Sequence, residues 1–314
     1  MFFRSLPSLE QIMSWAKGQD KIVIYYDLDS NNVGIFYRDT LKTLLTDQGK
    51  KDFIYGILIQ IQKIYHLLQK YKIRAKLVFF YNGTFKSLIG SYNTMEDKMA
   101  LEEVKKLYRS LGTVLSRLIN IYFVRNHSNI ITPLYYVQHR VFSSNVNIIL
   151  SNNKRYIPTL EFSGKKYGDT LIGYRYKKEW YAINKDNWLT KFWINEELDI
   201  RHFKHLVAIV GERHDSFSGV RGIGWKTIVK VVKEIDFTDE EMSSTDLYVK
   251  KLIQKGGKLG KVIDLYKDVI KNNSYNIFYP RSRFLDNALK IEKLSFNDSL
   301  KELSGLYEYV GNKI

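Results

Sequence analysis

The chain has 314 residues, of which 45% are hydrophobic and 14% aromatic, and it contains only 4 prolines. These values exclude a long disordered tail and predict a chain that is globular throughout, with enough length for a large core. Lysine and arginine outnumber aspartate and glutamate by 49 to 33, which gives a formal charge of +16. This excess favours a polyanionic partner, although a basic surface kept for solubility would give the same count.

The absence of cysteine excludes disulfides and thiolate metal sites, and the six histidines show no metal-ligand spacing. Any bound metal would therefore have oxygen ligands. The sequence has no apolar run of about 18 residues, and residues 1–20 lack the pattern of a signal peptide. We therefore expect a soluble protein of the cytoplasm, without a membrane partner.

The first half of the chain alternates between strand and helix patterns. Residues 21–29 form a continuous apolar run that ends in acids, which is typical of a buried parallel strand whose end opens onto a site. A helical pattern follows at 54–69, an apolar strand at 75–81, a helix at 95–119 and a strand at 145–151. This order predicts an α/β fold with a central, mostly parallel sheet flanked by helices, and ligands at the carboxyl ends of its strands.

The second half begins with a region rich in Tyr, Lys and Trp, which includes an expected antiparallel hairpin at 171–183. Basic and aromatic residues interleave from 165 to 181, so this surface could stack on frayed or single-stranded bases. A solvated strand face with cross-strand tyrosine pairs would show the same pattern. The chain becomes helical from residue 205, and residues 256–260 are expected to form a loop between C-terminal helices.

Residues 206–227 read LVAIVGERHDSFSGVRGIGWKT. Gly219, Gly222 and Gly224 permit positive φ angles and a close approach of another backbone. The helix that follows would present free N–H groups and the positive end of its dipole, which together can hold a phosphate. An ordinary glycine-rich turn between two helices is the alternative.

This segment resembles the signature of the 5′ nucleases, the family of flap endonucleases and 5′→3′ exonucleases. The matching residues are Gly211, Asp215, Gly219, Val220, Gly222, Ile223, Gly224, Lys226 and Thr227, and the departures are Glu212, Ser216 and Ser218. The resemblance implies an α/β domain at 1–200 and a helical domain at 201–314 with a helix-hairpin-helix at about 206–233. It also implies contacts to the DNA backbone, which position a duplex without reading its sequence, and a K⁺ ion at the hairpin. The implied DNA-binding residues are Gly219, Arg221, Gly222, Gly224, Lys226, Thr227, Arg38 and Lys86.

The end of the first strand resembles the first metal-binding stretch of the same family, in which an Asp at a strand end precedes small polar residues and an Arg. Asp29 is the better match and Asp27 the alternative, with Arg38 as the later arginine. A strand-end Asp that caps the next helix would look the same. Residues 80–86 resemble a second stretch of the family, but Asn82 stands where the second catalytic Asp is expected.

The carboxylates that the family supplies next are missing. No Asp or Glu occurs from residue 104 to residue 160, although this span contains several lysines and arginines. Two adjacent divalent ions require several carboxylates, because neutral Asn is a poorer ligand. The remaining candidates for a metal site or catalysis are Asp29, Asp27, Asp215 and Glu212, with Asp29 and Asp215 favoured as ligands of Mg²⁺.

The sequence therefore predicts a DNA-binding protein of 5′ nuclease fold whose catalysis is impaired or lost. An active Mg²⁺-dependent 5′→3′ exonuclease, flap endonuclease or RNase H with a reduced metal site is the first alternative. The second is a scaffold subunit of a viral replication or transcription complex, which would have protein partners. The abundance of Asn, Lys, Ile and Tyr is compatible with a bacteriophage origin.

Overall fold

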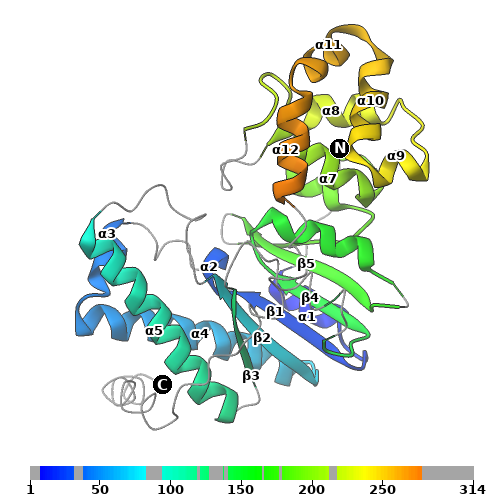
Figure 1. The fold of residues 1–314 in the computed structure, drawn as a ribbon. Coiled ribbons are helices and arrows are strands. Elements are labelled where there is room, and N and C mark those ends of the chain that lie inside the picture. Colours follow the sequence, from blue (N-terminus) through cyan, green and yellow to red (C-terminus); the bar gives the residue numbers. More distant parts are fainter. Residues whose placement is uncertain are drawn as a thin grey trace.

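A six-stranded sheet forms the centre of the protein (Figure 1). The computed structural model describes residues 8–31, 38–82, 94–118, 121–126, 137, 141–164, 166–176, 179–211 and 218–277. The strands are β1 (Ile22–Asp27), β2 (Ala75–Asn82), β3 (Ile121–Asn126), β4 (Val146–Leu150), β5 (Asp169–Tyr176) and β6 (Glu179–Ile183). In the order β3-β2-β1-β4-β5-β6, all neighbours are parallel except β5 and β6, so the predicted fold class is confirmed.

β1 is buried along its whole length because it has a strand on each side and packed residues on both faces. This burial on both faces explains why residues 21–29 form a continuous apolar run and do not alternate with polar residues. The predicted hairpin is also present, with β5 and β6 paired antiparallel. β3 was not predicted, because it begins only three residues after a long helix ends at Leu118 and continues the same apolar pattern.

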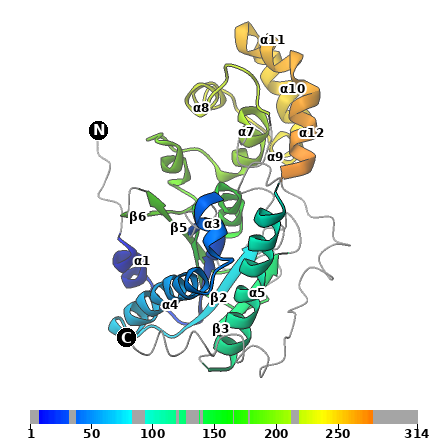
Figure 2. The ribbon, with the colours of Figure 1, turned by 90° about the vertical axis from the view of Figure 1, so that its left-hand side faces the viewer.

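Two hydrophobic clusters cover the two faces of the sheet. On one face, side chains from alternate positions of β1 to β4 pack against α1 (Leu9–Trp15), α4 (Asp47–Lys70) and α5 (Met95–Leu118). Figure 2 shows α4 and α5, which contact each other over this face. On the other face, the cluster extends from β1 through the 3₁₀ helices η2 (Lys154–Phe162) and η3 (Trp188–Phe192) into the C-terminal helices.

Of the two predicted helices in this half of the chain, α4 is longer than its apolar pattern, whereas α5 matches the predicted range to within one residue. α4 begins at Asp47 because the hydroxyl of Thr46 accepts a hydrogen bond from the Gly49 N–H and caps the helix. α5 begins at Met95, where Thr94 and Asp97 accept each other's backbone N–H groups. Two short helices, α2 (Leu28–Asn31) and α3 (Arg38–Thr43), lie between β1 and α4.

The C-terminal helices gather at the top of Figure 1, above β5. They are α7 (Phe203–Val210), which follows η4 (Ile200–His202), then α8 (Trp225–Val232), α9 (Asp239–Ser243), α10 (Thr245–Lys255), α11 (Gly257–Leu265) and α12 (Lys267–Ile277). None of the helices in the described ranges is long and apolar enough to cross a membrane. The division of the chain into domains at residue 200 stays a prediction.

The expected loop at residues 256–260 is wrong. Only Gly256 lies between α10 and α11, and residues 257–260 form the first turn of α11. Gly256 and Gly257 have φ angles of 77° and 69°, so they make the sharp turn between the helices. A Cβ atom at Gly260 would lie 2.9 Å from the backbone oxygen of Ile253, so this glycine lets α11 pack closely against α10.

Two buried histidines join the start of α7 to α9 and α10. The Nδ1 atom of His202 lies 2.7 Å from the Tyr248 hydroxyl, and Nε2 of His205 lies 2.9 Å from the backbone oxygen of Met242. The His205 ring also stacks on Tyr248 at 4.1 Å. Burial lowers the pKa of His202 to about 4 and the pKa of His205 to about 3, so both rings are neutral near pH 7.

We expect the protein to lose stability in acid because of these histidines. The stability that these neutral, buried rings contribute is complete above their unfolded pKa of about 6.5. It is lost as the pH falls toward their folded pKa values, because the unfolded chain then binds more protons than the folded protein. Each histidine should lower the free energy of unfolding by up to about 1.4 kcal/mol per pH unit in this window. Urea unfolding at several pH values measures this slope. The variant His202→Gln/His205→Asn should show a smaller slope, whereas a variant of the exposed His66 should keep the wild-type slope. Equal slopes in all three proteins would contradict the role of His202 and His205 in the loss of stability.

Candidate functional site

The chain reverses its direction across the sheet between β1 and β4. From β1 it proceeds to β2 and β3 on one side, and later to β4, β5 and β6 on the other. Ligands of such sheets bind outside the carboxyl ends of the strands at this switch point. The residues that follow β1 and β4 meet here, namely 28–31 and 151–153.

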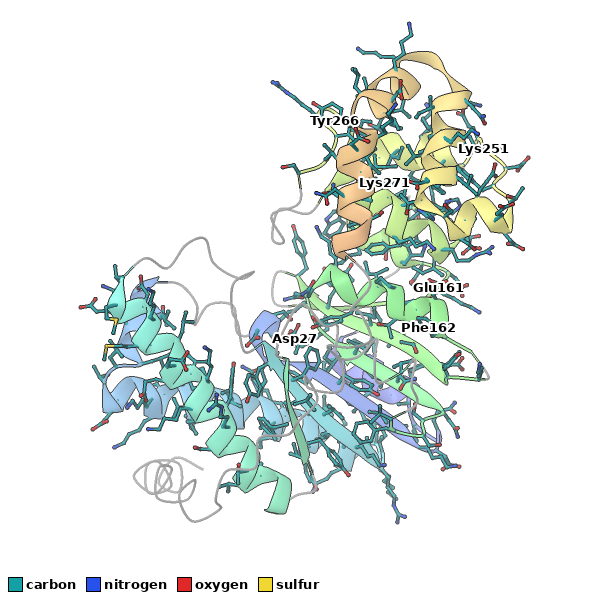
Figure 3. All side chains as sticks on the ribbon, in the orientation of Figure 1. Asp27, Glu161, Phe162, Lys251, Tyr266 and Lys271 are labelled. Carbon is teal, nitrogen blue, oxygen red and sulfur yellow. The ribbon has the colours of Figure 1, made fainter. Side chains whose placement is uncertain are left out.

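Asp27, the last residue of β1, is buried at this switch point (Figure 3). One carboxylate oxygen accepts hydrogen bonds from the backbone N–H groups of Asp29 at 3.1 Å and Ser30 at 3.0 Å. The other accepts the Ser151 hydroxyl at 2.6 Å. Burial raises the pKa of Asp27, and the hydrogen bonds from Ser151 and Ser30 oppose this shift. Asp27 therefore caps α2 and ties it to β4, as the alternative interpretation of the sequence anticipated.

Neutral side chains extend this connection to β5. The hydroxyls of Ser30 and Ser151 lie 3.0 Å apart, and the Asn152 N–H donates to Ser30 Oγ at 3.1 Å. The Asn31 amide donates to the backbone oxygen of Leu150 at 2.9 Å. Asn152 Oδ1 accepts the backbone N–H of Arg175 at 2.6 Å. A network of hydroxyls and amides thus occupies the carboxyl ends of β1, β4 and β5.

Asp29 lies beside Asp27 and is equally buried, with 4% of each residue exposed. It belongs to α2 rather than to the strand. Burial raises the pKa of the Tyr108 hydroxyl on α5, and the negative charge of Asp29, followed by that of Asp27, adds to this effect. Asp29 is therefore close to Tyr108 of α5.

The described residues do not fit a site for two divalent ions. They contain no group of three or more His, Cys, Asp or Glu side chains that could hold a metal. Asp27 and Asp29 are the carboxylates at the switch point, and the oxygens of Asp27 already accept three hydrogen bonds. Glu212, Asp215 and Lys86 lie outside the described residues, as do the side chains of Arg38 and Asn82.

The glycine-rich segment runs from residue 218 into α8, and residues 212–217 lie outside the described part. The Val220 N–H donates to the backbone oxygen of Ile209 at 2.7 Å, which holds the segment against α7. Gly219 lies so close to α7 that an added Cβ would be 1.8 Å from the Val210 backbone oxygen. Gly222 has a φ of 83°, as expected for a turn glycine, whereas Gly224 is extended with a φ of −109°.

One side of this segment is buried and the other is exposed. Val220, Ile223 and Ile228 are buried in the hydrophobic cluster. The predicted DNA contacts of this region are exposed, apart from the partly buried Gly219; they are Arg221, Gly222, Gly224, Lys226 and Thr227. Gly224 is the N-cap of α8 and provides no side-chain hydrogen bond, so the first N–H groups of the helix face outward without a side-chain cap.

Aromatic contacts connect this segment with the end of β4. Trp225, the first residue of α8, stacks on Phe192 of η3 at 3.7 Å. The ammonium of Lys154, three residues beyond Ser151, lies 5.6 Å from the centre of the Phe192 ring. The glycine-rich segment and the switch point are therefore joined through η3. Nothing in the sequence pattern indicated this contact.

The expected basic and aromatic surface is partly buried in the described residues, and residues 165, 177 and 178 lie outside them. Tyr174 and Tyr181 form a cross-strand stacked pair, and Tyr174 is buried under the Lys191 ammonium at 3.6 Å. Tyr176 and Trp193 are 40% and 43% exposed, and their rings lie 4.9 Å apart. Trp193 has a φ of 60°, which is unusual for a bulky side chain. Sequence reasoning missed Trp193, because no motif marks it.

Comparisons with known proteins give a structural likeness only. No family model matches the sequence, and no curated protein matches it. The bacteriophage T5 D15 protein, crystallised with metal ions, aligns with a TM-score of 0.53 at 13% identity over 92% of this chain and 99% of its own. The T5 5′-exonuclease with bound zinc gives 0.51 at 12% identity, with the same coverage. A lysine-substituted T5 D15 flap endonuclease, described as a pseudo-enzyme–product complex with DNA and metal ions, gives 0.51 at 13% identity over 91% and 99%.

Proposed function

We propose that this chain, which has the fold of the 5′ nucleases, is a DNA-binding protein that has lost most or all of its metal-dependent cleavage. In this proposal, the protein binds the backbone of duplex or branched DNA through a helix-hairpin-helix at residues 206–233, with a K⁺ ion at the hairpin. The observation that carries the proposal is the exposed N-terminus of α8, which lies beside the exposed Arg221 and Lys226. The pseudo-enzyme of the same fold bound to DNA supports it.

The local geometry suits a phosphate. The backbone N–H groups of residues 225–227 precede the first hydrogen bond within α8, which Ile228 donates to Gly224. Cβ atoms at Gly222 and Gly224 would meet no atom within 4 Å, so the space above them is open to another backbone. Helix N-termini of this kind bind anions through N–H groups and the helix dipole, without reading a sequence.

The hydrogen bonds of Asp27 support the proposed loss of cleavage. A ligand carboxylate must direct an oxygen toward the metal, but both oxygens of Asp27 are directed at Ser151 and at the start of α2. Ser151, Asn152 and Asn153 supply neutral groups where the 5′ nucleases carry acids, so too little negative charge is present to hold two ions. The presence of Asp29 beside Asp27 is the observation that favours the alternative, an active nuclease with a reduced site.

Binding to fluorescent duplex, nicked and flap DNA, measured by anisotropy with EDTA and then with Mg²⁺, tests the proposal. We expect salt-dependent binding to all three in EDTA, with affinities within about threefold of those in Mg²⁺, because the protein's own cations and N–H groups make the contacts. Binding that requires Mg²⁺ would argue for the active nuclease. Absence of binding at low salt would reject a DNA-binding role.

Trp193 and Tyr176 should stack on unpaired bases. In Trp193→Gly, the left-handed backbone suits glycine, so the fold should remain intact. We expect the affinity for DNA with a single-stranded overhang to fall about 5- to 150-fold, which corresponds to roughly 1–3 kcal/mol for one stacked base, and the affinity for blunt duplex to stay the same. Trp15→Ala is the matched control, because Trp15 is 44% exposed on α1. Equal losses for both DNA forms would contradict the stacking role.

A further inference from the structure

A basic cavity lies at the amino ends of β1 and β2, at the sheet edge opposite to the switch point. Its volume is about 860 Å³. Four cations contribute to its wall: Lys21 precedes β1, Lys72 and Arg74 lie between α4 and β2, and Lys76 is the second residue of β2. The volume lies within the range of about 300–1,000 Å³ that is typical of small-molecule sites.

The charge of this cavity is one-sided. None of its lining residues is an Asp or Glu. Within the described ranges, no ion pair involves any of the four cations. The Lys76 ammonium instead lies 5.1 Å from the centre of the Phe142 ring. All four residues are exposed, so water and salt weaken their mutual repulsion, but together they give the cavity a positive potential that attracts anions.

The backbone has an unfavourable feature at the same place. Lys21 and Lys72 both have a φ of 53°, and they are two of the three non-glycine residues with a positive φ in the described part of the chain. Lys72 follows the end of α4, where the Ile73 N–H bonds back to the Leu68 oxygen at 2.8 Å. Glycine or asparagine is usual at such a position. The helix already carries a cation in its last turn, Lys70, so the helix dipole does not require Lys72.

We propose that this cavity binds a compact ligand that carries two or more phosphate groups. Several phosphates would neutralise four cations, and the concave shape suits a compact ligand better than an extended duplex. The ring of Tyr65, which is 39% exposed, lines the wall beside Leu68, so a nucleobase could pack there. Inorganic polyphosphate and nucleotides share this chemistry. The site uses none of the residues of the proposed DNA contact, so either proposal can fail alone.

Isothermal titration of the full chain with sodium tripolyphosphate and, separately, with ATP tests this site. We expect both to bind. The variant Lys72→Asn/Arg74→Gln should bind each at least about tenfold more weakly for each cation removed, and asparagine at residue 72 tolerates the left-handed backbone. Lys17→Gln/Lys63→Gln is the charge-matched control, because both lysines are exposed outside this cavity; it should bind as the wild type does. Tighter binding of ATP would identify a nucleotide site, and equal affinities a site for the phosphates alone.

Three outcomes would overturn the proposal. The first is no binding of either probe to the wild type, and the second is equal binding by the cavity variant and the control. The third is a pair of results: blunt duplex DNA displaces tripolyphosphate from the wild type, and the variant Lys72→Asn/Arg74→Gln loses DNA affinity to a matching degree. The cavity would then be part of a DNA-binding surface. A test with Gly224→Ala distinguishes this from the proposed function, since that variant should bind tripolyphosphate normally.

Discussion

Replacing Gly219 by alanine is expected to destabilise the protein and abolish its binding to DNA. The new Cβ atom would lie 1.8 Å from the backbone oxygen of Val210 and 2.2 Å from its carbonyl carbon. Backbone atoms of α7 cannot rotate away as a flexible side chain can, so the glycine-rich segment must separate from the helix. Overpacking costs about 1–3 kcal/mol or more, and we expect the upper end of this range in urea unfolding.

Gly224→Ala is the matched control for this substitution. Its Cβ atom would meet nothing within 4 Å and its φ of −109° is accessible to alanine. The free energy of unfolding should therefore change by less than about 1 kcal/mol, because the lower entropy of the unfolded chain and the poorer N-capping by alanine oppose each other. The affinity for DNA should nevertheless fall, because the methyl group occupies the approach to the first N–H groups of α8. Normal stability in Gly219→Ala would contradict the described packing, and normal DNA affinity in Gly224→Ala would contradict the phosphate contact.

The double variant Arg221→Gln/Lys226→Gln should lose about 10- to 100-fold in DNA affinity at low salt, because two cations of the exposed segment no longer neutralise phosphates. The slope of the logarithm of the binding constant against the logarithm of the salt concentration should become shallower by about 2, or roughly 0.9 for each phosphate contact. Anisotropy titrations over a salt series provide both values.

Lys258→Gln/Lys261→Gln removes the same charge from exposed positions of α11. If DNA binding depends on the local contact and not on the net charge of the chain, this control should keep the wild-type slope. An equal change of slope in the two double variants would indicate that the +16 charge acts as a whole, and it would remove the evidence for a contact at α8.

Much of the sheet could be predicted because its central strands are buried on both faces. The apolar runs that became β1, β2 and β4 needed no knowledge of their partners. The sequence does not predict β3 because this strand follows α5 directly, and it predicts a loop at residues 256–260 because glycine usually interrupts helices. In the structure, Gly260 instead serves close packing of α11 on α10, which depends on a tertiary contact.

The glycine-rich segment and the hydrogen-bond network of Asp27 also differ in how far the sequence predicts them. The residues of the glycine-rich segment are contiguous in the sequence, so the pattern itself identified the exposed Gly222, Gly224 and Lys226. The network of Asp27 joins residues that are 124 positions apart, and no sequence pattern indicates that the Ser151 hydroxyl occupies its carboxylate. The roles of Asp215 and Glu212 as metal ligands stay predictions.

The central claim is that the protein binds DNA but does not cleave it with the help of a metal ion, and a cleavage assay tests this claim most directly. The purified protein would be incubated with labelled flap and nicked DNA in Mg²⁺ and in Mn²⁺, beside Asp29→Ala and Asp27→Asn, with binding followed in the same samples. We predict that all three proteins bind the DNA and that none cleaves it above background. Cleavage by the wild type that disappears in Asp29→Ala, with binding unchanged, would contradict the account and establish a working nuclease with a reduced metal site.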